Sequence, residues 1–118
     1  MAWVTFKTPT ETVSVNTDQI FPAEPNLDTP GDDVDLWWNA ARQTLVIEPF
    51  AAVIAKLGAD FVQFDVAGVR PNSCVVNRKL VISVIPHPQV PKVCFLQGAV
   101  RRMSVKGDLE SVTRKLGG

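Results

Sequence analysis

The feature that most constrains the fold of this chain is a sequence pattern that occurs twice. Residues 46–58, VIEPFAAVIAKLG, resemble residues 105–117, VKGDLESVTRKLG, and the match extends back to residue 34 at an offset of 59. The segments 3–6 and 61–64, WVTF and FVQF, match at an offset of 58, and the segments 13–25 and 74–86 match at 61. Because an undetected repeat leads to a wrong fold, we interpret residues 1–58 and 59–118 as two copies of one unit.

Each unit has the same predicted order of elements. Strand-like runs rich in β-branched residues lie at 3–6, 12–16 and 19–24, and again at 61–64, 73–77 and 80–85. Pro25 or Pro86 ends the third run because proline cannot donate to a β ladder. A polar or proline-rich loop follows, and then a hairpin at 34–48 or 93–105 with Asn39 or Gly98 in its turn. We expect these strands to be mainly antiparallel.

A short helix is predicted to close each unit. In the first unit, Pro49 suits the opening turn, and an apolar stripe at helical spacing precedes Gly58: Phe50, Val53, Ile54 and Leu57. In the second unit, Asp108 can act as N-cap, and Leu109, Val112 and Leu116 form the stripe before Gly117. The predicted fold class is therefore α+β, an internally duplicated unit of four to five strands followed by one helix, with pseudo-two-fold symmetry. Units of this size are marginal alone, so we expect a single domain with a shared core.

The charge is divided between the two units. Residues 1–58 contain 3 Lys or Arg and 8 Asp or Glu, whereas residues 59–118 contain 9 and 4, so balances of −5 and +5 cancel to zero. This asymmetry favours a polar partner for one unit, or association between copies of the chain. A homo-oligomer is therefore expected.

Alternation in the segment 33–38 predicts an interaction surface. Asp33, Asp35 and Trp37 share one face of the expected strand, opposite Val34, and the ungapped match at offset 59 aligns Leu96 with Trp37. We predict that Trp37, Leu96, Asp33 and Asp35 form this surface. Packing of Trp37 against the other unit or against a loop is the alternative.

The basic residues of the second unit suggest a second kind of site. The candidates are Arg78, Lys79, Lys92, Arg101, Arg102, Arg114 and Lys115. If they gather on one face beside an aromatic residue, they suit a single-stranded nucleic-acid backbone with stacked bases. If they are scattered, they form an ordinary solvated surface.

Patterns typical of catalysis and of metal binding are absent from the sequence. There is no glycine-rich phosphate loop, no H-E-x-x-H, no G-x-S-x-G and no calcium loop. The single histidine, His87, lies in the proline-rich stretch PHPQVP, and there is no tyrosine. Cys74 and Cys94 lie in apolar runs, where buried, reduced thiols are expected. We therefore predict a protein that is not an enzyme and uses no metal or cofactor.

Apolar residues make up 46% of the chain, yet no run approaches the roughly 18 apolar residues that a membrane span needs. The N-terminus lacks the features of a secretory signal. A soluble, cytoplasmic protein is expected.

The second unit resembles the small flagellar FlbD-like proteins. The matching positions are Gly68, Asn77, Val81, Pro86, Val93, Gly98, Val105 and Val112, and the first unit matches through Asn16, Ile20, Pro25, Val46 and Val53. This resemblance implies a small cytoplasmic accessory or regulatory protein without catalysis. The order of strands and helix is also similar to the ββββα repeats of Whirly-type and PUR-type binders of single-stranded nucleic acid.

Two functional hypotheses follow. The leading one is a non-enzymatic regulatory module that acts through protein–protein contacts on an exposed sheet face. The alternative is a Whirly- or PUR-like protein that binds single-stranded DNA or RNA through the basic second unit.

Overall fold

The computed structural model describes residues 3–26, 28, 32–39, 42–67, 72–99 and 101–117. Gly68 and parts of the hairpin turns, residues 40–41 and 100, lie outside the described residues. The first half contains β1 (Trp3–Lys7), β2 (Thr12–Asn16), the 3₁₀ helix η1 (Thr17–Gln19), β3 (Pro22–Pro25), β4 (Val34–Trp37), β5 (Gln43–Val46) and α1 (Phe50–Leu57). The second contains β6 (Phe61–Val66), β7 (Asn72–Asn77), the 3₁₀ helix η2 (Arg78–Leu80), β8 (Ser83–Pro86), β9 (Val93–Gln97), β10 (Arg102–Lys106) and α2 (Leu109–Lys115).

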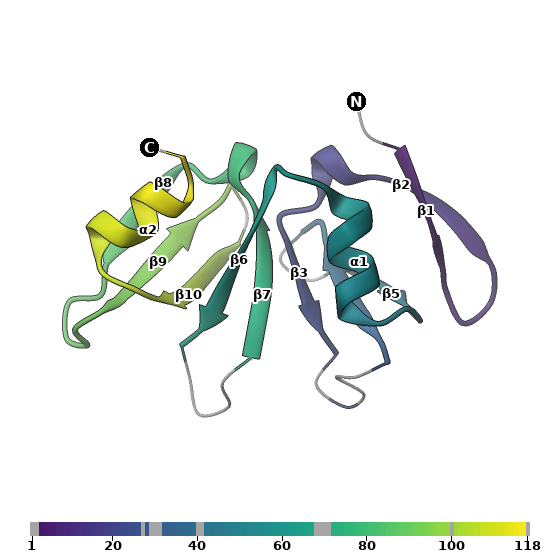
Figure 1. The fold of residues 1–118 in the computed structure, drawn as a ribbon, viewed down its shortest axis with the longest axis horizontal. Helices are drawn as coiled ribbons and strands as arrows, with labels where there is room; N and C mark the ends of the chain where they lie inside the picture. The colour runs from purple at the N-terminus through teal and green to yellow at the C-terminus, as the bar shows by residue number, and fades with distance from the viewer. Residues whose placement is uncertain are drawn as a thin grey trace.

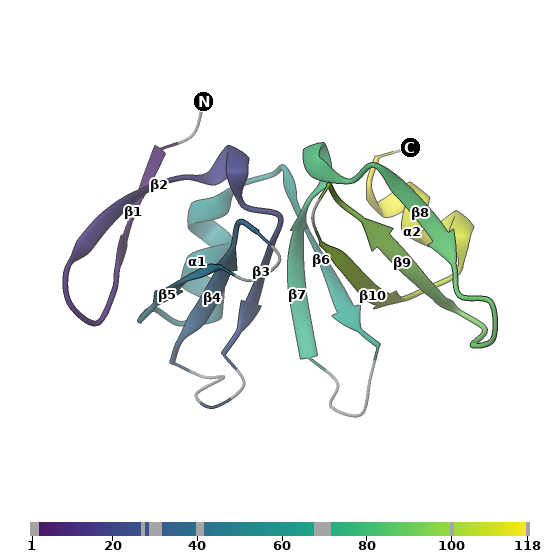
Figure 2. The ribbon, with the colours of Figure 1, turned by 180° about the vertical axis from the view of Figure 1, so that it is seen from behind.

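Antiparallel pairing organises the strands. Eight of them form one sheet in the order β5-β4-β3-β7-β6-β10-β9-β8, and β1 and β2 form a separate hairpin. Both helices lie on the same side of the strands, so Figure 2, the view from behind, shows strands in front of both helices. The prediction of a mainly antiparallel α+β fold with two short helices is confirmed.

The two hairpins that open the halves have the same register. Trp3 pairs with Asn16 and Phe6 with Val13 in β1–β2, whereas Phe61 pairs with Asn77 and Phe64 with Cys74 in β6–β7. Each hairpin ends at an asparagine whose side-chain oxygen accepts the backbone N–H two residues later, at 3.1 Å in both cases. Asparagine favours this local turn, and a 3₁₀ helix follows it in both halves. These 3₁₀ helices shorten the third predicted strand of each half.

The next strands show that the ungapped sequence match is wrong by one residue. Ala23 pairs with Leu36 in β3–β4, and Val84 pairs with Leu96 in β8–β9, so Leu96 corresponds to Leu36 and not to Trp37. The cause is a turn of different length, residues 38–42 in the first half and residues 98–101 in the second. A slip of one residue moves a side chain to the other face of a strand. Leu96 is therefore fully buried and forms no exposed surface.

The described side chains form two hydrophobic cores. The first core contains Phe6, Val34, Leu36, Val46 and Val53 of the first half, together with Phe61 and Val75 from β6 and β7. The second contains Phe64, Cys74, Leu96, Val105 and Val112, together with Phe21 from the first half. Alternate residues of β6 and β7 thus enter different cores. The β6–β7 hairpin lies between the two cores. At the junction of the two halves, β3 pairs with β7.

Candidate nucleic-acid interface

The predicted surface around Trp37 is largely occupied by the chain itself. Asp35 is buried, and its carboxylate accepts hydrogen bonds from Asn26 Nδ2 at 3.3 Å and Gln43 Nε2 at 3.1 Å. Burial raises the pKa of Asp35, and the bond from Asn26 partly opposes this. Trp37 and Asp33 are half-buried. Trp37 does not offer a bare stacking face, because the guanidinium of Arg101 lies 4.2 Å from the centre of its ring.

Arg101 links the two halves of the molecule. Besides covering Trp37, its guanidinium forms an ion pair with the Glu24 carboxylate at 3.4 Å. Burial raises the pKa of Glu24, an effect that Arg101 and Trp37 oppose. Since Arg101 lies in the β9–β10 turn and Glu24 lies in β3, this half-buried contact crosses the junction. Arg101 therefore contributes to the packing of the halves.

Arg78 and Lys79 are exposed cations in η2. Their side chains lie 3.5 Å and 3.0 Å from the Asp60 carboxylate. The hydrogen bond from Lys79 is the main cause that lowers the pKa of Asp60. Exposed ion pairs of this kind contribute little to stability, so both cations can exchange Asp60 for another anion at small cost.

Arg102 lies near η2 at the same end of the sheet. Its guanidinium lies 4.7 Å from the centre of the Phe95 ring, and its Nε donates to Gln97 Oε1 at 2.8 Å. Gln97 pairs with both Arg102 and Ser83, and the Ile82 N–H donates to its carbonyl at 2.8 Å. These contacts connect the β9–β10 turn to the segment that follows η2. Both segments lie toward the upper edge of the molecule in Figure 2.

Three other basic residues of the predicted set lie elsewhere. Lys92 is in the loop between β8 and β9, at the far end of these strands. Arg114 forms an ion pair with Glu110 on α2 at 2.7 Å. Lys115 donates to the carbonyl of Gln63 at 2.6 Å and lies 4.5 Å from the centre of the Phe64 ring. Arg78, Lys79, Arg101 and Arg102 thus lie in η2 and the β9–β10 turn, at one end of the strands, and Lys92 lies at the other end. Arg114 and Lys115 lie in α2, and Gly117, just after this helix, approaches the Arg78 guanidinium.

Sequence reasoning missed Arg42 and Trp38 at the same end. Arg42 is exposed in the β4–β5 turn, where its carbonyl accepts the Trp38 N–H at 3.3 Å. The partly exposed Trp38 lines a pocket of about 250 Å³ together with Gln19, Phe21, Leu80 and Ala99. The sequence could have indicated both residues, because the two predicted hairpins place the β4–β5 turn at a position equivalent to that of the β9–β10 turn.

The described residues offer no sign of metal chemistry or of a membrane-spanning helix. They contain no group of three or more side chains that could hold a metal ion. None of their helices is long and apolar enough to cross a membrane. Cys74 and Cys94 are buried thiols, and burial raises the pKa of Cys74 to about 12. Neither thiol is suited to act as a nucleophile.

Comparison with known proteins gives one informative result. No protein-family model and no curated protein sequence matches the chain. Among solved structures, the chain is similar to the LytTR DNA-binding domain of a putative methyl-accepting/DNA response regulator from Bacillus cereus. The likeness covers 100% of this chain and 98% of that chain, with a TM-score of 0.65 and 17% sequence identity. It shows that the two chains share a fold.

This likeness corrects the sequence-based predictions. The resemblance to FlbD-like proteins, and to Whirly- and PUR-type repeats, is wrong, because the fold over the whole chain is that of a LytTR DNA-binding domain. The residues on which this resemblance is based reflect strand alternation, turns and helix caps, which many folds share. The leading hypothesis of a module acting through protein–protein contacts on a sheet face is wrong for the same reason. The prediction that the chain is not an enzyme agrees with its likeness to a domain described as DNA-binding.

Proposed function

We propose that this chain is a non-catalytic domain that binds double-stranded DNA. The observation that carries the proposal is the full-length likeness to a solved domain described as DNA-binding, at a TM-score of 0.65. The Whirly- and PUR-like alternative named nucleic acid as the ligand, and the present proposal replaces its single-stranded substrate with duplex DNA.

The distribution of exposed cations supports one end of the molecule as the contact surface. Arg78 and Lys79 in η2, Arg102 at the start of β10 and Arg42 in the β4–β5 turn are exposed. We call these four residues the basic end. Phosphate contacts from Arg and Lys supply essentially all of the affinity in non-specific DNA binding and a large share of it in specific binding, and they depend on the cations at the contact surface. A local group of cations is therefore sufficient even though the chain is neutral overall.

The opposite end is unsuited to DNA. The β3–β4 loop lies there and contains Asp28, Asp32 and Asp33. Like charges would repel a phosphate backbone at this loop. This contrast defines how the domain would approach the duplex, with the basic end toward the DNA and the β3–β4 loop away from it.

The proposal extends to the organisation of the chain. The equal hairpin register and the equal asparagine turns support residues 1–58 and 59–118 as copies of one folding unit within one domain. A role in a cytoplasmic regulator, analogous to the response regulator that contains the solved domain, is part of the same proposal.

Fluorescence anisotropy with labelled oligonucleotides tests the function. A pool of random duplexes and a matching single-stranded pool are titrated with the chain at low and high salt. We expect duplex binding that weakens steeply with salt and exceeds single-strand binding. Absence of duplex binding at low salt, or a preference for the single strand, would contradict the proposal.

Charge-removal variants test the surface. Replacing Arg78, Lys79 and Arg102 by Gln removes three exposed cations of the basic end. We expect the slope of log K against log salt to fall by about 2.7, since each lost contact with B-DNA accounts for about 0.9. The matched control replaces Lys92, Lys106 and Arg114 by Gln, which removes the same charge elsewhere. Equal slopes for the two triple variants would exclude the basic end.

A further inference from the structure

Each half has a strand with a free edge, β8 at one edge of the eight-stranded sheet and β2 in the separate hairpin, and the two edges are complementary. Within the described residues, β8 pairs only with β9, and β2 pairs only with β1. At the junction inside the chain, β3 pairs with β7. By register, β8 occupies the position of β3 in its half, and β2 occupies the position of β7. The two strands with free edges, β8 and β2, are thus the counterparts of β3 and β7, which pair with each other inside the molecule.

Two aromatic side chains pack across the β3–β7 junction inside the chain. Phe61, at the start of β6, is 8% exposed and packs with Val75 into the first core. Phe21 is 6% exposed and packs into the second core. The Asn77 N–H donates to the Phe21 carbonyl at 2.7 Å. Each half therefore places one large side chain in the other half's core.

The counterparts of these two residues are exposed at the free edges. Trp3 starts β1 and pairs with Asn16, as Phe61 pairs with Asn77, and it is 59% exposed. Ile82 donates its N–H to the Gln97 carbonyl, as Phe21 does to the Trp37 carbonyl, and it is 70% exposed. Large apolar side chains that are exposed beside an open strand edge mark a site of association.

The surface beside β8 is open at the position that Phe61 covers in the first half. A pocket of about 460 Å³ is lined there by Val81, Ile82 and Val84 of the β8 segment and by Leu109, Thr113 and Leu116 of the α2 segment. Leu57 is buried in the first core, whereas its counterpart Leu116 is only half-buried.

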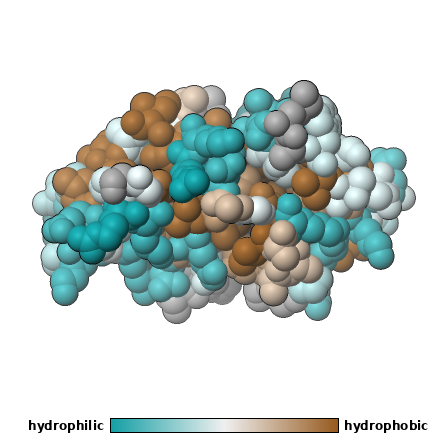
Figure 3. Space-filling model, turned by 45° about the horizontal axis from the view of Figure 1, so that its top comes forward, coloured by the Kyte–Doolittle hydropathy of each residue, from teal (hydrophilic) through white to brown (hydrophobic). Residues whose placement is uncertain are grey.

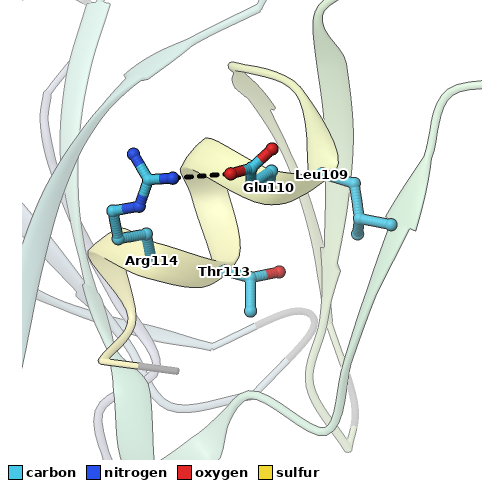
Figure 4. Close-up of a pocket in the computed structure, with 4 residues that line it drawn as sticks. All are labelled: Leu109, Glu110, Thr113 and Arg114. Atoms are coloured by element: carbon cyan, nitrogen blue, oxygen red, sulfur yellow. Dashed lines mark hydrogen bonds and ion pairs between the residues drawn. The ribbon is translucent and has the colours of Figure 1, made fainter.

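The pictures locate this open surface. Figure 4 shows the Leu109 and Thr113 side chains projecting from α2 apart from the Glu110–Arg114 ion pair. Figure 3 shows hydrophobic atoms at the surface on the side of the molecule that carries the second half.

The β2 edge has a matching pocket. A depression of about 390 Å³ is lined by Trp3, Ser14, Val15, Asn16, Gln19, Ile20, Trp38 and Thr44. Val15 is the counterpart of Val76, which belongs to the core that receives Phe21. The pocket therefore lies where the counterpart of Phe21, Ile82 of a second molecule, would enter.

We propose that copies of this chain associate head to tail, with β8 of one copy pairing antiparallel with β2 of the next in the register of the β3–β7 junction. Ile82 of the first copy enters the pocket beside β2, and Trp3 of the second copy enters the pocket between β8 and α2. Pairing places Ser83 opposite Val15 and Val84 opposite Ser14, as Pro22 lies opposite Val76 and Ala23 opposite Val75. This self-association goes beyond DNA binding and does not depend on it.

Charge favours the same arrangement. At the junction inside the chain, Asp18 of η1 is one of the groups that raise the pKa of Lys79 in η2, after the larger contribution of Asp60. Pairing of β8 with β2 brings the same two 3₁₀ helices together again, now from different molecules. The balances of −5 and +5 in the two halves attract in this orientation. Because the contact is heterologous, it produces chains or closed rings.

Sedimentation velocity without DNA tests the proposal. The wild-type chain is expected to form species larger than dimers as its concentration rises. Ile82→Glu and Trp3→Lys each block one edge with a charge, and each variant alone is expected to remain a monomer. A one-to-one mixture retains one intact pair of edges, Ile82 of the Trp3→Lys variant and Trp3 of the Ile82→Glu variant. The mixture should therefore form dimers and nothing larger.

The controls separate this result from loss of folding. Val90→Glu places a charge on an exposed residue in the β8–β9 loop and should associate like the wild type. Circular dichroism of each variant should match the wild type, because the replaced side chains are exposed. A wild-type chain that remains monomeric at NMR concentrations would overturn the proposal. So would single variants that associate like the wild type, or a mixture that remains monomeric.

Discussion

The β1–β2 and β6–β7 hairpins share a register and a terminal asparagine turn, yet they are buried differently. The inner face of β1–β2 packs into the first core through Phe6, and its outer face carries the exposed Trp3. In β6–β7 both faces contribute to a core, with Phe64 in the second core and Phe61 and Val75 in the first. The hairpin pattern therefore specifies the strands and their register. Position in the chain decides whether the second face is covered, because only β6–β7 has a half on each side.

The largest expected difference between the hairpins concerns their first residues. Phe61→Ala should lower the free energy of unfolding by about 3–5 kcal/mol, because a buried aromatic leaves a cavity. Trp3→Ala should cost about 0.5 kcal/mol or less in a dilute monomer, since its side chain is mostly exposed. Urea unfolding monitored by circular dichroism measures both. If Phe61→Ala does not fold, Phe61→Leu provides a smaller loss that can still be compared with Trp3→Leu. Equal losses would refute the two-faced burial of β6–β7.

The residues before the two helices provide a second comparison. Gly107 has a φ of +137°, and a Cβ there would lie 2.8 Å from Val112 Cγ2. Gly107→Ala should therefore cost about 1–3 kcal/mol through backbone strain and crowding. Its counterpart Glu48 pairs with Lys56 at 2.7 Å and accepts the Lys7 N–H at 3.0 Å. Glu48→Ala should cost about 1 kcal/mol or less. Thermal unfolding of the two variants would contradict this account if their order were reversed.

The asparagine turns should differ by a smaller amount. Asn77 is buried, accepts the Lys79 N–H, and donates to the Thr17 carbonyl at 3.4 Å across the junction. Asn16 makes the same local turn and is half-buried. Asn77→Ala should therefore cost about 1 kcal/mol more than Asn16→Ala, the typical contribution of one further hydrogen bond. Chemical denaturation measures the difference, and a greater loss for Asn16→Ala would argue against a structural role for the junction contact.

The smallest expected effect contrasts the outer faces of β4 and β9. Asp35 is buried at the position where β9 has Phe95. Its pKa is raised in the folded state, so folding favours the protonated acid, and this residue's contribution to stability falls as pH rises through the raised value. The stability of Asp35→Asn relative to the wild type should therefore increase from acidic to neutral pH. Denaturant titrations at several pH values test the sign, with Asp32→Asn as a control for the loss of one charge. A difference that decreases with pH would refute it.

Much of the fold was predictable because its signals are local. Alternation predicted the strands, Asp108 predicted the start of α2, where its carboxylate accepts the Ser111 N–H at 2.8 Å, and Gly58 and Gly117 marked the helix ends. The burial of Leu96 was not predictable from the ungapped match, because one additional residue in the first turn changes the face of every residue before it.

The candidate site was only partly predictable for a related reason. Segments that connect antiparallel strands lie at the ends of a sheet, so the strand order places η2 with Arg78 and Lys79 at the same end as Arg102. Whether these cations form one binding surface stays a prediction. The position of Lys92 at the opposite end depends on where the β8–β9 loop lies, and the approach of Arg78 to Gly117 depends on where α2 packs; no sequence spacing encodes either. The partnership of Arg101 with Glu24 and Trp37 joins residues of different halves, and only their packing reveals it.

By itself, the sequence determined the periodic and local features of this protein: strands, the asparagine turns, the helix ends and the absence of recognisable catalytic motifs. These features depend on neighbouring residues, whose side chains and backbone groups interact before any long-range packing exists. Only the tertiary structure decided that β3 pairs with β7, that β6–β7 separates two cores, and that Trp3 and Ile82 remain exposed while Phe61 and Phe21 do not. These outcomes depend on which surfaces come into contact when the two halves pack, because a side chain is buried only if another part of the chain covers it.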